Sequence, residues 1–131
     1  MITMKYTVLI TIAALVYTFI LGGRVGIRRL KLGVDAPAIS GQTEFDVAFR
    51  IHMNTIEQLV LFIPMLWIAV TVIGDIWAAA IGAVWIVGRM IYAAGYTADV
   101  NKRRPGMIIT LLSTAVLTVM SLWGVVQAFL S

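Results

Sequence analysis

Four long apolar stretches constrain this chain more than any other feature of its sequence. They cover residues 6–22, 59–73, 76–94 and 107–130. Each of them, with its flanks, can cross a hydrocarbon core of about 30 Å as a helix that rises about 1.5 Å per residue. Alternating segments of about ten residues, which are typical of a membrane barrel, are absent. The sequence therefore predicts an all-α integral membrane protein built as a bundle of four transmembrane helices.

Composition supports the same fold class. Hydrophobic residues make up 61% of the 131 residues and charged residues only 12%, which is too apolar for an ordinary soluble domain. We expect a single membrane domain over residues 1–131. Its expected helices cover approximately residues 4–31, 44–73, 76–100 and 105–130. The first apolar run is longer than that of a signal peptide and no Ala-x-Ala site follows it, so we expect it to be retained as a helix.

Local signals predict how the helices are connected. Glycines and a proline within residues 33–42 predict a loop. Thr43 and Asp46 have the spacing of a capping box, which predicts that the second helix begins there. Gly74 and Asp75 form so short a connection that the second and third helices must be antiparallel neighbours.

Basic residues are sorted by side of the predicted bundle. All Lys and Arg residues except Lys5 belong to the first and third connections or to the helix ends beside them. By the positive-inside rule, these connections face the cytoplasm and both termini lie on the opposite side of the membrane. The formal net charge of +4 alone would fit nucleic acid binding, but these charges do not form the surface patch of a soluble domain. We therefore expect membrane lipid, and no nucleic acid, as a partner.

The inventory of reactive residues argues against several kinds of site. The chain has no cysteine and a single histidine, His52, so neither a metal site nor a thiol nucleophile is expected. No Gly-x-Ser-x-Gly elbow and no phosphate-binding Gly-Lys-Ser/Thr loop is present. Glu57 stands alone among apolar residues, whereas a proton pathway needs acids spread across the membrane. Any sulfur chemistry must use a thiol that a ligand brings in.

Two polar stripes stand out against the apolar background. Helical steps of about 100° place Arg50, Asn54 and Glu57 within about 60° of one another near the start of the second helix. Because ionised groups that face hydrocarbon cost several kcal/mol each, we expect this stripe to lie inside the bundle. A second stripe lies on the third helix, and its side chains fall within about 80° of one another if the helical register continues. Its members are Arg89, Tyr92, Tyr96, Asp99 and Arg103.

Together the stripes would suit a small ligand that carries carboxylates and an ammonium group. Arginines would bind the carboxylates in a forked geometry, and Glu57 would accept the ammonium group. The cations expected at the cytoplasmic end of the bundle are Arg29, Arg50, Arg89 and Arg103, and the neutral polar groups there are His52, Asn54, Gln58, Tyr92 and Tyr96. The alternative interpretation is that Glu57 pairs with Arg50 or Arg89 only to neutralise charge inside the bundle.

Three motifs occur in order along nearly the whole chain. They are Gly-Val-x-Ala-Pro in the first loop, Glu-Phe-x-x-Ala-Phe-Arg-x-x-x-Asn-x-x-Glu at the second helix, and Gly-Arg-x-x-Tyr-x-x-Gly-Tyr at the end of the third. A basic pair followed by Pro-Gly precedes the fourth helix. In these motifs the chain resembles the MAPEG family, the membrane-associated proteins in eicosanoid and glutathione metabolism. The resemblance implies a homotrimer that binds glutathione between neighbouring subunits near the cytoplasmic side.

The same resemblance implies which residues bind glutathione. The positions similar to the family's glutathione ligands are Arg29, Arg50, His52, Asn54, Glu57, Gln58, Tyr92 and Tyr96. His52 matches a histidine of the prostaglandin-forming member. Gln58 replaces an aromatic residue that some relatives have, so the binding mode at that position is expected to differ.

The resemblance also implies a catalytic role for Arg103. It falls where the leukotriene-forming synthases have the arginine that activates the thiol, and the spacing does not separate it from the adjacent Arg104. Lowering the pKa of a thiol by two units from about 8.5 takes roughly 2.7 kcal/mol. A guanidinium about 4 Å away is worth on the order of 4 kcal/mol at an effective dielectric constant of about 20. One arginine is therefore sufficient.

We therefore predict a membrane-bound glutathione transferase that activates the glutathione thiol for attack on lipophilic electrophiles, as in detoxification. Glutathione peroxidase or isomerase activity would use the same thiolate. The hydrophobic small-molecule substrate is expected to enter from the bilayer. Two alternatives stay open on the sequence: a non-catalytic lipid- or partner-binding membrane protein of the same fold, and a small membrane scaffold or transporter subunit.

Overall fold

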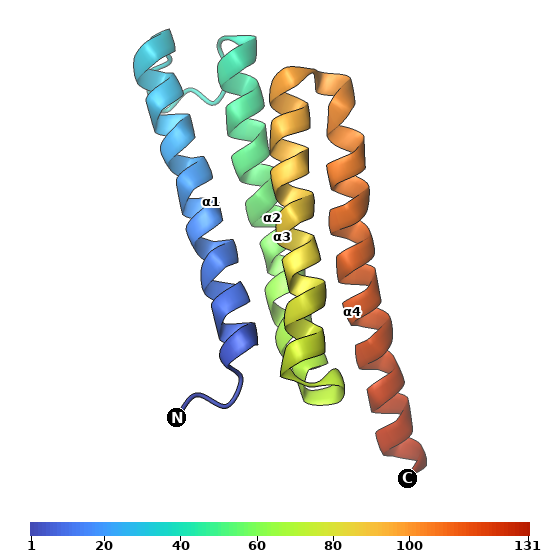
Figure 1. Ribbon diagram of the computed structural model, residues 1–131. Helices are drawn as coiled ribbons and strands as arrows, with labels where there is room; N and C mark the ends of the chain where they lie inside the picture. The colour runs from blue at the N-terminus through green and yellow to red at the C-terminus, as the bar shows by residue number, and fades with distance from the viewer.

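The computed structural model describes residues 1–131 as four long helices that run side by side (Figure 1). The elements are α1 (Lys5–Leu32), α2 (Thr43–Ile73), α3 (Asp75–Ala98), the short 3-10 helix η1 (Val100–Arg103) and α4 (Arg104–Leu130). Four helices are long and apolar enough to cross a membrane. The predicted all-α architecture with four transmembrane helices is therefore confirmed.

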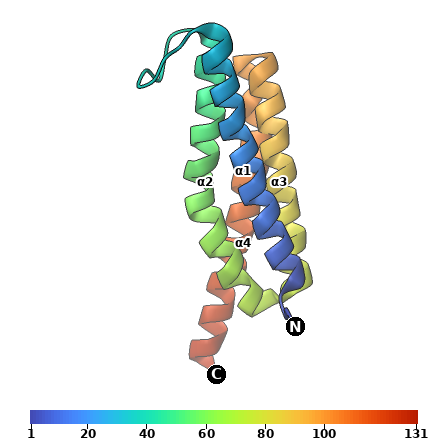
Figure 2. The ribbon, with the colours of Figure 1, turned by 90° about the vertical axis from the view of Figure 1, so that its left-hand side faces the viewer.

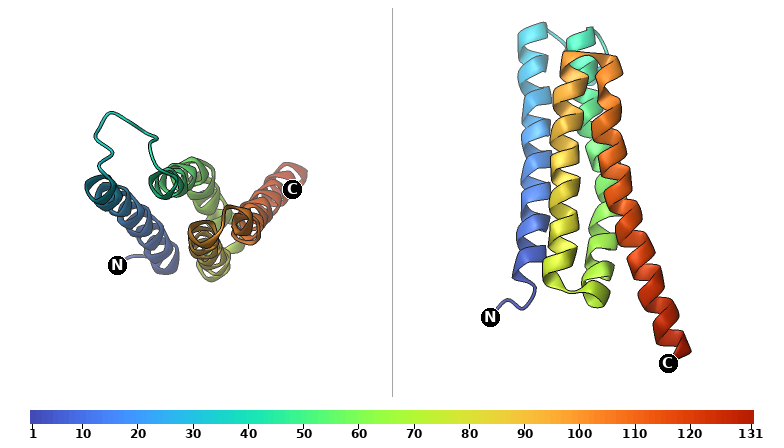
Figure 3. Two further views of the ribbon diagram at one scale, coloured as in Figure 1. Left: turned by 90° about the horizontal axis from the view of Figure 1, so that it is seen from above. Right: turned by 45° about the vertical axis from the view of Figure 1, so that its right-hand side comes forward.

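The helices alternate in direction, so the connections gather at the two ends of the bundle. The loop of residues 33–42 and η1 lie at one end, which we call the loop end, and both termini lie at the other with Gly74 (Figure 1). The loop of residues 33–42 projects from the loop end (Figure 2). Seen from above, α1 and α4 lie on opposite sides of the bundle, with α2 and α3 between them (Figure 3).

The middle of the bundle is held together by aromatic stacking and by close helix contacts. The rings of Phe62 on α2 and Trp85 on α3 stack with centroids 4.1 Å apart and planes 5° apart, and both side chains are fully buried. Helices α3 and α4 approach each other closely at Gly88 and Gly106. The approach is so close that a Cβ atom at Gly106 would overlap the backbone of Tyr92. Small residues thus set the distance between these helices.

The end of α1 away from the loop end is capped by a side chain of another helix. Asp75, the first residue of α3, accepts hydrogen bonds from the backbone N–H groups of Tyr6 (3.0 Å) and Thr7 (2.7 Å). These are amide donors that the first turn of a helix cannot satisfy by itself. The carboxylate therefore joins α1 to the short connection between α2 and α3.

The expectation that the register of the third helix continues to Arg103 is wrong. Helix α3 ends at Ala98, because Asp99 adopts an extended backbone with φ −160° and ψ 130°. The Asp99 carboxylate then accepts a hydrogen bond of 2.8 Å from the backbone N–H of Asn101 and begins η1. A 3-10 helix has about three residues per turn, so the α-helical period no longer sets the direction of Arg103.

The predicted capping box at the start of α2 is also wrong. The N-cap residue is Gln42, and no side chain caps the helix. Instead, the carboxylate of Asp46 accepts hydrogen bonds from the Ser40 hydroxyl (3.0 Å) and from the Gly41 N–H (3.1 Å). The loop folds back over the first turn, so Asp46 anchors the loop and makes no bond to Thr43.

Candidate functional site

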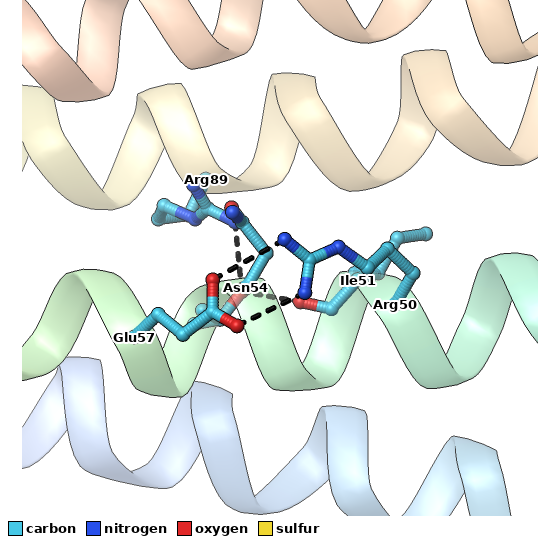
Figure 4. Close-up of polar contacts among 6 residues, drawn as sticks. Arg50, Ile51, Asn54, Glu57 and Arg89 are labelled. Carbon is cyan, nitrogen blue, oxygen red and sulfur yellow. Dashed lines mark hydrogen bonds and ion pairs between the residues drawn. The ribbon is translucent and has the colours of Figure 1, made fainter. Parts of the chain in front are cut away.

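The polar stripe of α2 divides in the structure. Arg50 and Glu57 form a bidentate ion pair, with Nη1 to Oε1 at 2.9 Å and Nη2 to Oε2 at 3.3 Å (Figure 4). Their side chains are 48% and 51% exposed, so the expectation that the whole stripe lies inside the bundle is wrong for this pair. The inward face of α2 is occupied by buried apolar residues such as Phe62 and Leu66, and Arg50 and Glu57 lie beyond its edge.

Asn54 is the member of this stripe that does point inward. It is 8% exposed, and its Oδ1 accepts a hydrogen bond of 2.8 Å from Nη2 of Arg89 on α3 (Figure 4). The same Nη2 donates to Thr55 Oγ1 at 3.0 Å. The Asn54 carbonyl oxygen is thus bound to Arg89, whereas the side-chain N–H groups of Asn54 remain free to donate hydrogen bonds to a ligand.

Arg89 is a buried cation without an acidic partner. It is 1% exposed and forms no ion pair, since the one nearby carboxylate, Glu57, binds Arg50. Its guanidinium carbon lies 4.2 Å from the ring centroid of Tyr92, in a cation–π contact. Its Nε and Nη1 have no hydrogen-bond partner within the protein. Thr55, which the sequence analysis did not single out, therefore supplies one of only two hydrogen-bond acceptors to this charge.

The tyrosines of α3 and the cation of η1 form a third part of the site. Tyr92 is buried and meets Tyr96 edge to face, with ring centroids 5.6 Å apart. Arg103 Nη1 donates to the hydroxyl of Tyr96 at 3.3 Å, and the guanidinium carbon lies 5.2 Å from the centre of that ring. Arg104 is exposed at the start of α4. Although η1 interrupts the register, the chain turns back and places Arg103 against Tyr96.

The remaining predicted site residues lie elsewhere in the protomer. Arg29 donates to the carbonyl oxygen of Ala38 at 2.6 Å and covers the ring of Phe45, so it holds the first loop. His52 lies against α1, where a Cβ atom at Gly22 would be 3.1 Å from its Nε2. Gln58 is half-buried, and its Oε1 has no hydrogen-bond partner within the protein. Neither Arg29 nor His52 contacts the Arg50–Glu57 pair.

The arrangement combines cations, one acid and neutral donors in the loop-end half of α2 and α3. Ile51, the residue after Arg50, belongs to one buried cluster with Tyr92, and Tyr96 packs against that cluster, so the exposed pair and the tyrosines lie in one region. No group of three or more His, Asp and Glu side chains could hold a metal ion. These groups can bind a small zwitterion, and Arg103 can stabilise an anion beside it.

Comparison with known proteins gives an independent result. The model of the MAPEG family matches residues 7–123. An uncharacterized protein of Synechocystis is 38% identical over 117 residues, which cover 89% of this chain and 85% of that protein. Human microsomal glutathione S-transferase 2 is 36% identical over 107 residues, covering 82% and 73%. Bovine leukotriene C4 synthase is 28% identical over 102 residues, covering 78% and 68%.

Proposed function

Because the chain belongs to the MAPEG family, we propose that it is a glutathione transferase that activates the glutathione thiol for attack on lipophilic electrophiles. Its four apolar helices make it an integral, multi-pass membrane protein. The named relatives are a glutathione transferase and a leukotriene synthase, which supports glutathione as the co-substrate. The hydrophobic second substrate would reach the site from the bilayer.

The observation that carries this proposal is the half-exposed ion pair of Arg50 and Glu57. The two side chains bind each other with two hydrogen bonds on the outer surface of a membrane-spanning helix. Glutathione carries two carboxylates and an ammonium group. A carboxylate can replace Glu57 on the Arg50 fork, while the ammonium group takes the Glu57 carboxylate. The pair is thus a binding site whose two halves satisfy each other when no ligand is bound.

The same pair supports assembly into the family-typical homotrimer. Charged groups that face hydrocarbon cost several kcal/mol each, so a neighbouring protomer that covers Arg50 and Glu57 would remove that cost. Arg29 and His52 are directed toward the first loop and α1, away from this pair. A site between two protomers would therefore combine Arg29 and His52 of one copy with Arg50 and Glu57 of its neighbour.

Arg103 is the residue we assign to thiol activation. Tyr96 orients its guanidinium through a hydrogen bond of 3.3 Å, whereas no side-chain hydrogen bond orients Arg104. A glutathione thiol beside this cation would lose its proton to solvent at the loop end, and the thiolate would then form a carbon–sulfur bond with the electrophilic carbon while the bond from that carbon to its leaving group breaks. The two tyrosine hydroxyls and the Asn54 amide can donate hydrogen bonds to glutathione carbonyl or carboxylate oxygens. With a peroxide as the electrophile, the same thiolate would attack one peroxide oxygen, and the O–O bond would break to release an alcohol after protonation. A second glutathione thiol would then displace water from the resulting sulfenic acid and give glutathione disulfide.

The test is the ultraviolet difference spectrum of glutathione added to the detergent-purified protein at neutral pH. We expect a thiolate band with the native protein and with Lys102→Ala, which removes a neighbouring cation that forms neither a hydrogen bond nor a cation–π contact with Tyr96. We expect no band with Arg103→Ala. A band that persists in Arg103→Ala and disappears in Arg104→Ala would move the role to Arg104. Absence of both band and glutathione binding in the native protein would refute the transferase proposal.

A further inference from the structure

The face of α2 that is turned away from Arg50 and Glu57 lines a cavity. A cavity of about 760 Å³ lies at the loop end between α1, α2 and the end of α3. None of Arg50, Asn54 and Glu57 lines it, but Tyr96 does, so the cavity adjoins the proposed glutathione site at the end of α3 and extends from there toward α1. Seen from above, α1 stands apart from the end of α3 at this end of the bundle (Figure 3).

The cavity has a cationic rim and an apolar floor. Arg24, Arg28 and Lys31 line it from α1, and their spacings of four and three residues put them on one face of that helix. The floor includes Leu21 and Ile51, which are 2% and 3% exposed. The rim therefore lies where a membrane-spanning helix leaves the hydrocarbon, and the floor lies within it.

The rim carries more positive charge than the protein itself neutralises. Arg28 Nε pairs with Glu44 Oε1 at 3.0 Å, but Arg24 and Lys31 form no ion pair. Asp99 also lines the cavity, and its carboxylate caps η1 by accepting the N–H of Asn101. Two cations thus remain available to an anion that enters from the membrane surface.

We propose that this cavity binds an anionic phospholipid. Arg24 and Lys31 would hold the phosphate, and the upper part of an acyl chain would lie against Leu21 and Ile51. Basic pockets between transmembrane helices favour acidic lipid head groups, because the cations gain a partner without leaving the interface. A soluble anion would use only the rim and gain nothing from the apolar floor. The volume suits a head group and the first part of its chains.

The test compares phosphatidylglycerol with phosphatidylcholine of identical acyl chains, titrated onto the full-length protein in detergent and followed by native mass spectrometry. We expect the native protein to prefer phosphatidylglycerol. The double variant Arg24→Gln/Lys31→Gln should lose on the order of 30-fold in affinity for that lipid, about fivefold for each cation near the surface. The matched control Lys102→Gln/Arg104→Gln removes two charges at the same end but outside the cavity, and should lose less than about fivefold.

A second variant tests the floor without changing the charge. Ala48 lines the cavity, so Ala48→Phe should fill part of it and also weaken phosphatidylglycerol binding. Helix content and elution volume would show that each variant is folded. Equal affinity of the native protein for the two lipids would overturn the proposal. Equal losses of affinity in the cavity and control double variants would mean that the lipid is attracted by the overall charge, which would also overturn the proposal. Full competition by glycerol phosphate would mean that the site binds a soluble anion, with the same consequence.

Discussion

Asn54 offers the sharpest test of how the buried polar groups work. Asn54 Oδ1, at 2.8 Å, is one of two protein acceptors of Arg89, which is 1% exposed and has no acidic partner. Hydrogen bonds to charged groups contribute about 1.5–3 kcal/mol. We therefore expect Asn54→Ala to lower the free energy of unfolding by about 2 kcal/mol, because Thr55 alone would then face the charge.

The comparison with Asn54→Asp separates stability from ligand binding. A carboxylate at this position would pair with Arg89, and the gain would offset its desolvation. We expect the free energy of unfolding of Asn54→Asp to stay within about 1 kcal/mol of the native value. The variant lacks the amide N–H donors, however, so its affinity for glutathione should fall at least about tenfold.

Unfolding can be followed by tryptophan fluorescence during titration with sodium dodecyl sulfate, and glutathione binding by calorimetry. Asn101→Ala is the matched control, because that asparagine is exposed in η1 and its side chain makes no hydrogen bond within the protein. Native stability in Asn54→Ala would refute the argument that Arg89 depends on this acceptor. If Asn54→Asp lost as much stability as Asn54→Ala, desolvation of the carboxylate would outweigh the pairing.

Two further predictions concern the contacts that position the helices. Gly106→Ala should lower the free energy of unfolding by about 3 kcal/mol, because its Cβ would overlap the Tyr92 backbone. Gly23→Ala, with no atom within 4 Å, should instead raise it by up to about 1 kcal/mol, because alanine favours the interior of a helix over glycine. The same titration measures both, and equal effects would contradict the overlap. Asp75→Ala should cost about 1–2 kcal/mol and speed hydrogen exchange at the amides of Tyr6 and Thr7, whose cap it removes. Unchanged exchange at both amides would mean that Asp75 does not hold the start of α1.

Several features of this protein could be predicted from its sequence. Membrane spanning demands about 20 apolar residues in a row, and that demand is visible in the sequence without any knowledge of packing. The family was also predictable, because its motifs combine fixed spacings with rare residue types in a lipid-compatible chain, and the family comparison confirms it. The sequence placed Arg103 and Tyr96 on one polar stripe of the third helix, and the structure brings these two side chains together, although through η1 and not through a continuous helix.

The direction of each polar side chain depended on the tertiary structure. The helical period correctly places Arg50, Asn54 and Glu57 near one another on α2, but it does not say which part of that arc faces a neighbour. Contact with Arg89 on α3 makes Asn54 part of the interior, while Arg50 and Glu57 remain half-exposed. The end of α3 likewise depends on a local competition, in which the Asp99 side chain captures the Asn101 N–H. Sequence periodicity sets the angles between side chains on one helix, whereas only the packing of all four helices sets where the bundle axis lies relative to them.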